Sequence, residues 1–188
     1  MWWYNRLRCA EIDSDRLGDS YVRNLRAQFA GMGRSLWLLD VTSDLGIPVV
    51  VAVLRWKEGS RERIAFAAGA HFDLRVAAIQ AVAELSQVLA VDEMRQRTAG
   101  PARDGHSDVL HLRKNTYLLP RGKATVRRAV SAKFASLDRR DQILACVGLA
   151  RRRGLDFLVL DQTRPEVQVP VVRVIVPGLR PFRCRFSL

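Results

Sequence analysis

Residues Gly69–Gln87 read GAHFDLRVAAIQAVAELSQ, which is the most informative part of the sequence. Its apolar residues recur with the period of a helix, and Asp73 is placed to cap the N-terminus of that helix. The helix is expected to pack through one apolar side, which comprises Val76, Ile79, Val82, Ala83, Leu85, Val88 and Leu89. Burial of that side would hold the rest of the helix in a fixed orientation.

Three polar residues interrupt this apolar helix, namely Gln80, Glu84 and Gln87. Their i, i+4 and i+7 spacing places them on one helix face. Spacing alone favours the solvated side of an amphipathic helix. The same face could instead hold a hydrated divalent cation and the phosphates that it carries, because magnesium prefers oxygen ligands. The spacing leaves both interpretations open.

The sequence around this helix predicts further helices and short strands. Two more helices are expected, at Tyr21–Ala30 and from the cap Asp138 to Arg153, and the expected strands are Ser35–Val41, Val49–Trp56, Arg63–Ala68, Phe157–Leu160 and Val169–Val176. Residues Arg95–Lys114 are polar and contain Gly and Pro, which predicts an exposed loop. The element order predicts an α+β fold with mostly antiparallel strands and helices packed on the sheet.

Length and charge limit the classes of protein. With 188 residues and 48% hydrophobic residues, the chain can bury the core of one domain. Its formal net charge of +12 comes almost entirely from Arg, since only 4 of its 31 basic residues are Lys. Arginine suits phosphate ligands and acidic partners, but the basic residues are spread along the chain. Nucleic-acid binding therefore remains only an alternative.

The Cys and His residues form no known metal-binding pattern. Cys9, Cys146 and Cys184 lie far apart in the sequence, and no H-x-x-x-H or H-E-x-x-H motif occurs. No signal peptide is recognisable, and no run of eighteen apolar residues suggests a transmembrane helix. We therefore expect a cytoplasmic protein that does not enter a membrane.

Five sequence blocks, in order, resemble the carboxy-terminal half of a YcaO-type cyclodehydratase. They are WWYNRLR at Trp2–Arg8, LDVTSDLGIPV at Leu39–Val49, GAHFDLRVA with AVAELSQ within Gly69–Gln87, YLLP at Tyr117–Pro120, and GLDFLVLDQTRPE with VVRVIVPGL within Gly154–Leu179. The resemblance implies use of ATP and Mg2+ to phosphorylate a backbone amide of a ribosomally made peptide, as in bacteriocin-type biosynthesis. A Cys, Ser or Thr side chain attacks that amide, and the product is a thiazoline or an oxazoline.

The resemblance also implies roles for the polar residues of the central helix. Glu84 and Gln87 match the family's E-x-x-Q pattern, which implies that they bind magnesium and the nucleotide, and Gln80 matches a further position that faces the nucleotide. Arg95 or Arg97 is the implied phosphate ligand. No catalytic residue is assigned. The implied partners are a precursor peptide, a leader-peptide-binding protein and a second copy in a homodimer.

Departures from the family pattern predict an incomplete domain. We expect residues 1–188 to be the carboxy-terminal part of one YcaO-like domain whose amino-terminal half is absent, and we expect this chain to be inactive alone. Trp2 and Trp3 are then expected to be core aromatics left exposed, which would favour aggregation. The alternative is a YcaO-fold interaction or scaffold protein without catalysis.

Overall fold

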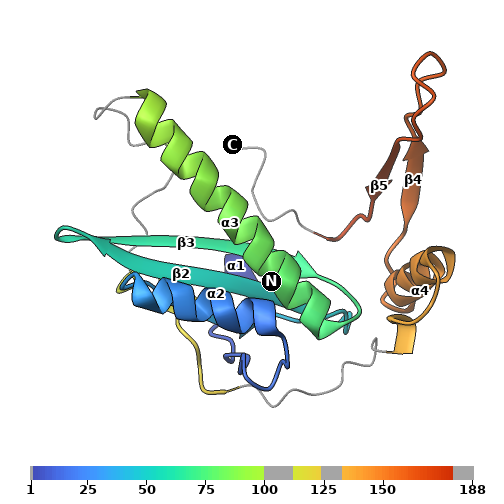
Figure 1. Ribbon diagram of the computed structural model, residues 1–188. Coiled ribbons are helices and arrows are strands. Elements are labelled where there is room, and N and C mark those ends of the chain that lie inside the picture. The colour runs from blue at the N-terminus through green and yellow to red at the C-terminus, as the bar shows by residue number, and fades with distance from the viewer. Residues whose placement is uncertain (1, 100–111, 124–132, 180–188) are drawn as a thin grey trace. The chain divides into compact units, whose positions relative to one another are not determined.

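A computed structural model describes residues 2–99, 112–123 and 133–179 (Figure 1). The chain divides into two compact units, Met1–Ala135 and Ser136–Leu188. Both combine helices with antiparallel strands, which confirms the predicted α+β fold class.

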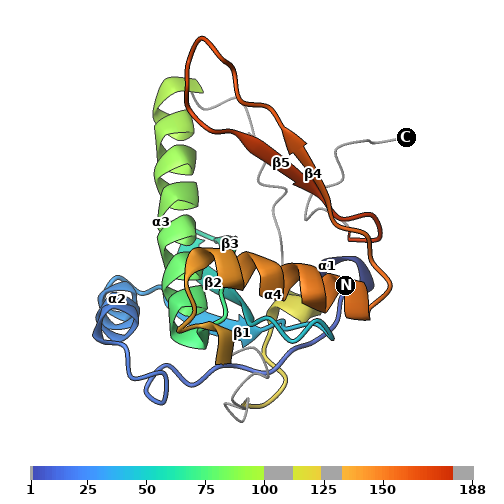
Figure 2. The same ribbon diagram turned by 90° about the vertical axis from the view of Figure 1, so that its right-hand side faces the viewer.

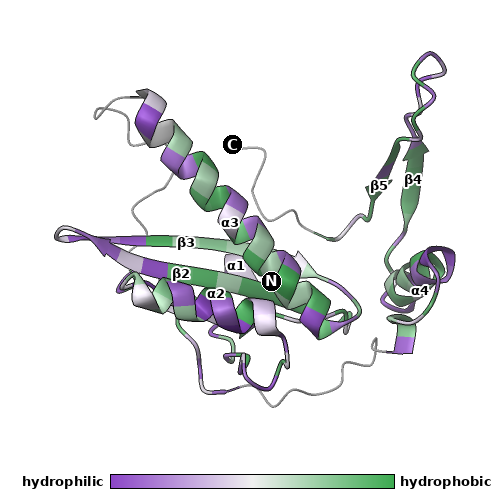
Figure 3. Cartoon of the chain, in the orientation of Figure 1, coloured by the Kyte–Doolittle hydropathy of each residue, from purple (hydrophilic) through white to green (hydrophobic). Residues whose placement is uncertain are grey.

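The first unit is built on a three-stranded antiparallel sheet in the order β1-β2-β3. The strands span Ser35–Asp40, Val49–Glu58 and Arg61–Ala70, close to the predicted ranges. β2 and β3 are joined by the two-residue turn Gly59–Ser60, where Gly59 has φ of 59°. A positive φ at the first turn position is typical of hairpins and favours Gly. The tip of this hairpin is hydrophilic, whereas most of its remaining length is hydrophobic (Figure 3).

Two helices cover one face of this sheet. They are α2, Ser20–Gly31, and α3, Leu74–Ala99. Figure 2 shows them on the opposite side of the strands from the short helix α1, Trp2–Asn5. The core on the α2–α3 side includes Val22, Phe29, Leu36, Leu38, Val50, Ala52, Leu54, Ala67, Ala77, Ala81 and Leu85. Alternate strand residues therefore face the two helices, as a period of two requires.

The other face of the sheet is covered by α1 and by the 3-10 helix Thr116–Leu118. Its core contains Trp2, Leu39, Val51, Val53, Ile64, Leu112, Tyr117 and Leu118. The outer edge of β1 also has a cover, because Ile12 N donates to Leu38 O at 2.8 Å and Asp40 N donates to Ala10 O at 3.0 Å. The second face of the sheet and the outer edge of β1 are therefore both covered by segments from elsewhere in the first unit.

The expectation that Trp2 and Trp3 are exposed is wrong. Trp2 is buried, with 7% of its surface exposed to solvent, and Trp3 packs against the hydrophobic cluster to which Trp2 belongs. Trp2 makes edge contacts with Phe66 and Tyr117, with ring centroids 6.1 and 5.3 Å apart. Aromatic pairs favour this geometry. The first unit therefore supplies its own partners for both Trp rings.

The prediction of an exposed loop at Arg95–Lys114 is wrong for residues 95–99 and for Leu112. Residues 95–99 continue helix α3, and Leu112 is buried, while residues 100–111 lie outside the described part of the chain. The Glu93 and Arg97 side chains form an ion pair at 2.6 Å, an i,i+4 arrangement that supports helix in this polar sequence.

Helix α3 is long and apolar enough, over Leu74–Met94, to span a membrane by length and composition. Here it serves as a core helix. Ala77, Ala78, Ala81, Val82 and Leu85 have no exposed area and belong to the core that α3 forms with the sheet. Two residues of the expected apolar side, Ala83 and Val88, are instead exposed.

The second unit consists of helix α4, Arg139–Arg152, and a two-stranded antiparallel sheet of β4, Leu158–Asp161, and β5, Val172–Ile175. Asp138 caps α4 as predicted, accepting a hydrogen bond from Asp141 N at 2.8 Å. The predicted apolar stripe of α4 is only partly buried, because Ile143 and Leu144 are exposed. Within the described residues of this unit, only Ala150 is buried.

Candidate functional site

The polar row of α3, defined as Gln80, Glu84 and Gln87, lies on the surface of the first unit. All three residues are exposed, while the buried residues Ala77, Ala81 and Leu85 of the same helix pack in the core. Of the predicted apolar side, Val82 and Leu85 are fully buried, so a core side and a polar side are separated on this helix as predicted, except at Ala83 and Val88. Within the described part of the chain, none of the three polar side chains makes a hydrogen bond or an ion pair.

Side chains hold α3 near both of its ends. At the start, Asp73 Oδ1 accepts a hydrogen bond from Arg75 N at 2.8 Å, and Asp73 N donates to His71 Nδ1 at 3.0 Å. Arg75 also pairs with Asp19 at 3.4 Å, which links α3 to the N-terminus of α2. Further along, Arg63 of β3 pairs with Asp92 at 3.1 Å. The polar row thus projects from a helix whose position is fixed before and after it.

The residue types of the polar row fit a magnesium nucleotide. Glu84 provides a carboxylate, and the two Gln side chains provide amide oxygens, which are the hard ligands that magnesium takes. The other described acidic residues of α3 are occupied, because Asp92 pairs with Arg63 and Glu93 pairs with Arg97. Glu84 is therefore the acidic residue of this helix that is available to a cation.

The row supplies too few ligands to hold an ion by itself. No group of three or more His, Cys, Asp or Glu side chains that could hold a metal occurs among the residues that the structure describes. Magnesium usually retains several waters and takes one or two protein carboxylates together with substrate phosphates. The polar row accordingly suits one side of such a site, with the remaining ligands provided from elsewhere.

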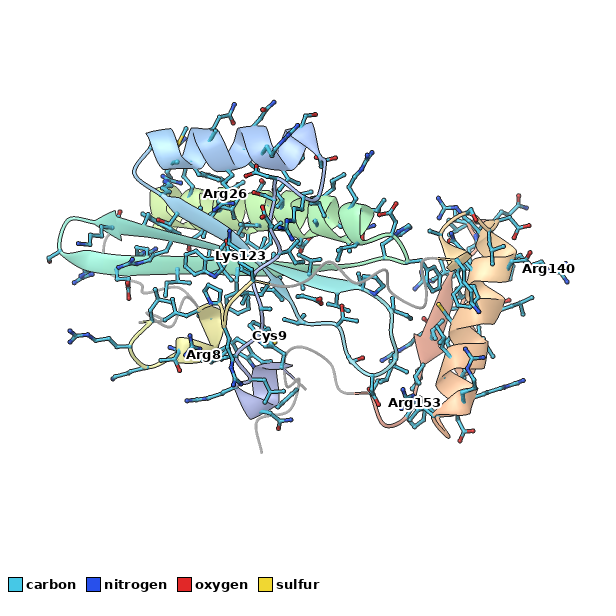
Figure 4. All side chains as sticks on the ribbon, turned by 90° about the horizontal axis from the view of Figure 1, so that it is seen from below. Arg8, Cys9, Arg26, Lys123, Arg140 and Arg153 are labelled. Carbon is cyan, nitrogen blue, oxygen red and sulfur yellow. The ribbon has the colours of Figure 1, made fainter. Side chains whose placement is uncertain are left out.

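The predicted phosphate-binding arginine whose side chain is described, Arg97, is not a free cation. Arg97 is exposed and pairs with Glu93, and the side chain of Arg95 lies outside the described residues. Other arginines of the first unit are also engaged and come from separate elements. Figure 4 labels two of them, Arg8, which donates to Pro120 O at 2.9 Å, and Arg26, which donates to Ser14 Oγ at 2.6 Å.

Two aspartates that follow strands act in turns. Asp40 Oδ1 accepts a hydrogen bond from Thr42 N at 3.0 Å, and Asp161 Oδ1 accepts one from Thr163 N at 2.9 Å. The hydrogen bonds from Thr163 lower the pKa of Asp161 below its ordinary value. Such bonds are typical of Asp in turns. The Asp19–Arg75 pair, which supports the polar row, has no local signal in the sequence, because its members lie 56 positions apart.

Comparisons with known proteins place this helix in a family context. Residues 1–180 match the family described as YcaO cyclodehydratase, ATP- and Mg2+-binding. An uncharacterised protein of Methanothermobacter thermautotrophicus is 29% identical over 92% of the chain, and a protein of Rhizobium leguminosarum bv. trifolii, encoded 3′ of tfuA, is 26% identical over 93%. The chain spans less than half the length of these relatives, 46% and 43%.

Solved structures agree with that match. The heterocyclase TruD is 34% identical with a TM-score of 0.74, and a heterocyclase in complex with substrate and cofactor is 35% identical with a TM-score of 0.76. Both matches cover 96% of this chain and about a quarter of the other, 25% and 24%. YcaO from Methanopyrus kandleri, bound with AMPPCP and Mg2+, shares the fold at 22% identity and a TM-score of 0.69, over 94% of this chain and 47% of that one.

Proposed function

The chain belongs to the YcaO cyclodehydratase family, and from this premise we propose that α3 forms one side of a site for ATP and Mg2+. The observation that carries the proposal is the polar row itself: three exposed oxygen-bearing side chains that have no partner among the described residues, on a helix held by ion pairs before and after them. The reaction we assign to the site is the ATP-dependent activation of a backbone amide in a peptide.

Each residue of the row has a role in this proposal. Glu84 would hold magnesium, Gln87 would complete the coordination shell directly or through water, and Gln80 would face the nucleotide. Bound ATP would supply the phosphoryl group. Phosphoryl transfer needs little covalent help from a protein, so these residues act by positioning the phosphates and by offsetting charge through the cation. Arg97 would have to leave Glu93 in order to bind phosphate.

Further aspects of the proposal follow from the family. We propose that the substrate is a ribosomally made peptide, that the product is an azoline and that the pathway is of the bacteriocin type. A protein that binds the leader peptide, and a second copy of the chain, are the proposed partners. The proposed location is the cytoplasm. A heterocyclase solved in complex with substrate and cofactor, 35% identical to this chain, supports a heterocycle-forming reaction that needs a cofactor.

Calorimetric titration with AMPPCP in the presence of Mg2+ tests the role of Glu84. The Glu84→Gln variant should bind the magnesium complex at least tenfold more weakly, because an amide replaces the anionic ligand. Glu58→Gln is the matched control, since Glu58 is exposed at the end of β2 and pairs with Arg63, which has no binding role at the proposed site. Equal affinities in the wild type and in Glu84→Gln would rule out the assigned role.

The titration is run on the chain alone and with a separately produced amino-terminal half of the Methanothermobacter relative, because this chain spans only 46% of that protein. Binding in either sample that depends on Glu84 supports the proposed site. The alternative function is a non-catalytic scaffold of the same fold. This alternative is favoured because the described residues contain no cluster of three His, Cys, Asp or Glu side chains that could hold a metal. It predicts that neither sample binds AMPPCP with Mg2+.

A further inference from the structure

Gly69 of β3 faces α3 at the point where helix and strand come closest. A Cβ atom placed on Gly69 would lie under 3.0 Å from the Ala77 carbonyl oxygen, the Ala81 amide nitrogen and Gln80 Cβ. Two of these three atoms belong to the helix backbone, so rotation of a side chain cannot relieve the overlap. The strand therefore tolerates no side chain here unless α3 moves away from the sheet.

The surrounding sequence is built for the same close approach. The residues of β3 that face α3 over this part of the strand are Ala65, Ala67 and Gly69, all of which are small. On the helix, Ala77, Ala78 and Ala81 have no exposed area. Small side chains on both surfaces let the backbones approach, and a packed interface of this kind cannot absorb added volume without a shift.

The polar row begins at this contact. Gln80 contributes its Cβ to the space that a side chain on Gly69 would need, and Glu84 and Gln87 follow one and two turns along the helix. A displacement of α3 at Gln80 would therefore carry the whole row with it. A displacement of about 1 Å is enough to weaken the interaction of a side chain with a metal ion or a phosphate group.

We propose that Gly69 is a positioning residue for the polar row: its missing side chain sets the depth at which α3 lies on β3, and hence where Glu84 meets the magnesium nucleotide. This inference rests on the function proposed above. Gly69 touches neither metal nor nucleotide and acts through α3.

The test compares Gly69→Ala with Gly31→Ala. Gly31 ends α2, has no positive φ, and a Cβ there would have no atom within 4 Å, so this control adds the same methyl group in open space. Affinity for AMPPCP with Mg2+ is measured for both variants, with the amino-terminal half of the Methanothermobacter relative present. We expect Gly69→Ala to weaken binding at least tenfold and Gly31→Ala to change it less than twofold. Equal affinities in all three proteins would overturn the proposal.

A double-mutant cycle with Glu84→Gln separates positioning from general destabilisation. If Gly69 acts by placing Glu84, then Gly69→Ala should add little to the loss already caused by Glu84→Gln, since both remove the same interaction. Full additivity of the two losses would contradict the mechanism. Should Gly69→Ala fail to fold, Ala67→Val enlarges the same row of β3 and takes its place in the cycle.

Hydrogen exchange distinguishes failure of this inference from failure of the proposed function. The amides of α3 should exchange at least tenfold faster in Gly69→Ala than in Gly31→Ala, because the helix loses its close packing. If the wild type binds no magnesium nucleotide, the proposed function fails and the positioning role with it, yet faster exchange would still establish the helix contact. Unchanged exchange in α3 would refute the contact regardless of binding.

Discussion

Asp19 stabilises two helices through one carboxylate. It caps α2 by accepting a hydrogen bond from Val22 N at 3.0 Å, and it pairs with Arg75 of α3 at 3.4 Å while only 8% exposed. We expect Asp19→Ala to lower the free energy of unfolding by about 1–3 kcal/mol, since it removes a cap and leaves nearby donors without a partner. Asp19→Asn should lower it less, because an amide oxygen can still cap. Urea unfolding followed by Trp fluorescence measures both.

The four Trp residues give this experiment a built-in control. Trp2, Trp3, Trp37 and Trp56 all lie in the first unit, Met1–Ala135. Asp138 caps α4 in the second unit with the same kind of hydrogen bond. Asp138→Ala should therefore leave the fluorescence transition in place. If Asp138→Ala shifted the fluorescence transition as much as Asp19→Ala does, the loss of stability in Asp19→Ala would not be specific to the two contacts of Asp19.

Among the elements, α1 is held by Trp2 and Trp3, of which Trp2 is the more deeply buried. Trp2 contacts Phe66 and Tyr117, and its indole N–H donates to the Tyr117 carbonyl at 3.4 Å. Truncation of a buried Trp typically costs about 3–5 kcal/mol, and we expect Trp2→Ala to fall in this range. Trp2→Phe should cost less because it keeps an aromatic ring in the cluster. Urea unfolding followed by circular dichroism measures both, and a loss below about 1 kcal/mol for Trp2→Ala would show that α1 contributes little to the fold.

The elements that sequence predicted well carry local signals. The cap Asp138 predicted the start of α4, and the predicted ranges of the first three strands lie close to those of β1, β2 and β3. The wrong predictions involve partners far away in sequence. The exposure of Trp2 and Trp3 was predicted because their partners were expected in an absent amino-terminal half, whereas their partner rings, Phe66 and Tyr117, lie more than sixty positions further along this chain.

The same distinction applies to the candidate site. The shared face of Gln80, Glu84 and Gln87 follows from helix periodicity, which is a local property of the chain. The contact of Gly69 with Ala77 and Ala81 depends on the depth of helix packing, which no local pattern specifies.

At the scale of the whole molecule, the two units differ in how much apolar surface they bury. The first unit has a core on each face of its sheet. In the second, strands β4 and β5 carry exposed apolar residues throughout, including Leu158, Val159, Leu160, Val172, Val174 and Ile175. An isolated two-stranded sheet is at best marginally stable in water, and exposed apolar patches favour association. Aggregation is therefore expected from this unit rather than from Trp2 and Trp3.

Polar substitution in this strand pair tests that expectation. Val159 and Val174 are directly paired across β4 and β5 and are 60% and 49% exposed. The double variant Val159→Thr, Val174→Thr should bind less of a hydrophobic dye and scatter less light, because Thr keeps the β-branched shape and removes apolar surface. The Trp fluorescence transition should stay unchanged, since all four Trp residues lie in the first unit. Gln162→Thr, at an exposed polar position beside β4, is the control for the substitution itself. Dye binding that persists in the double variant would assign the association to another surface.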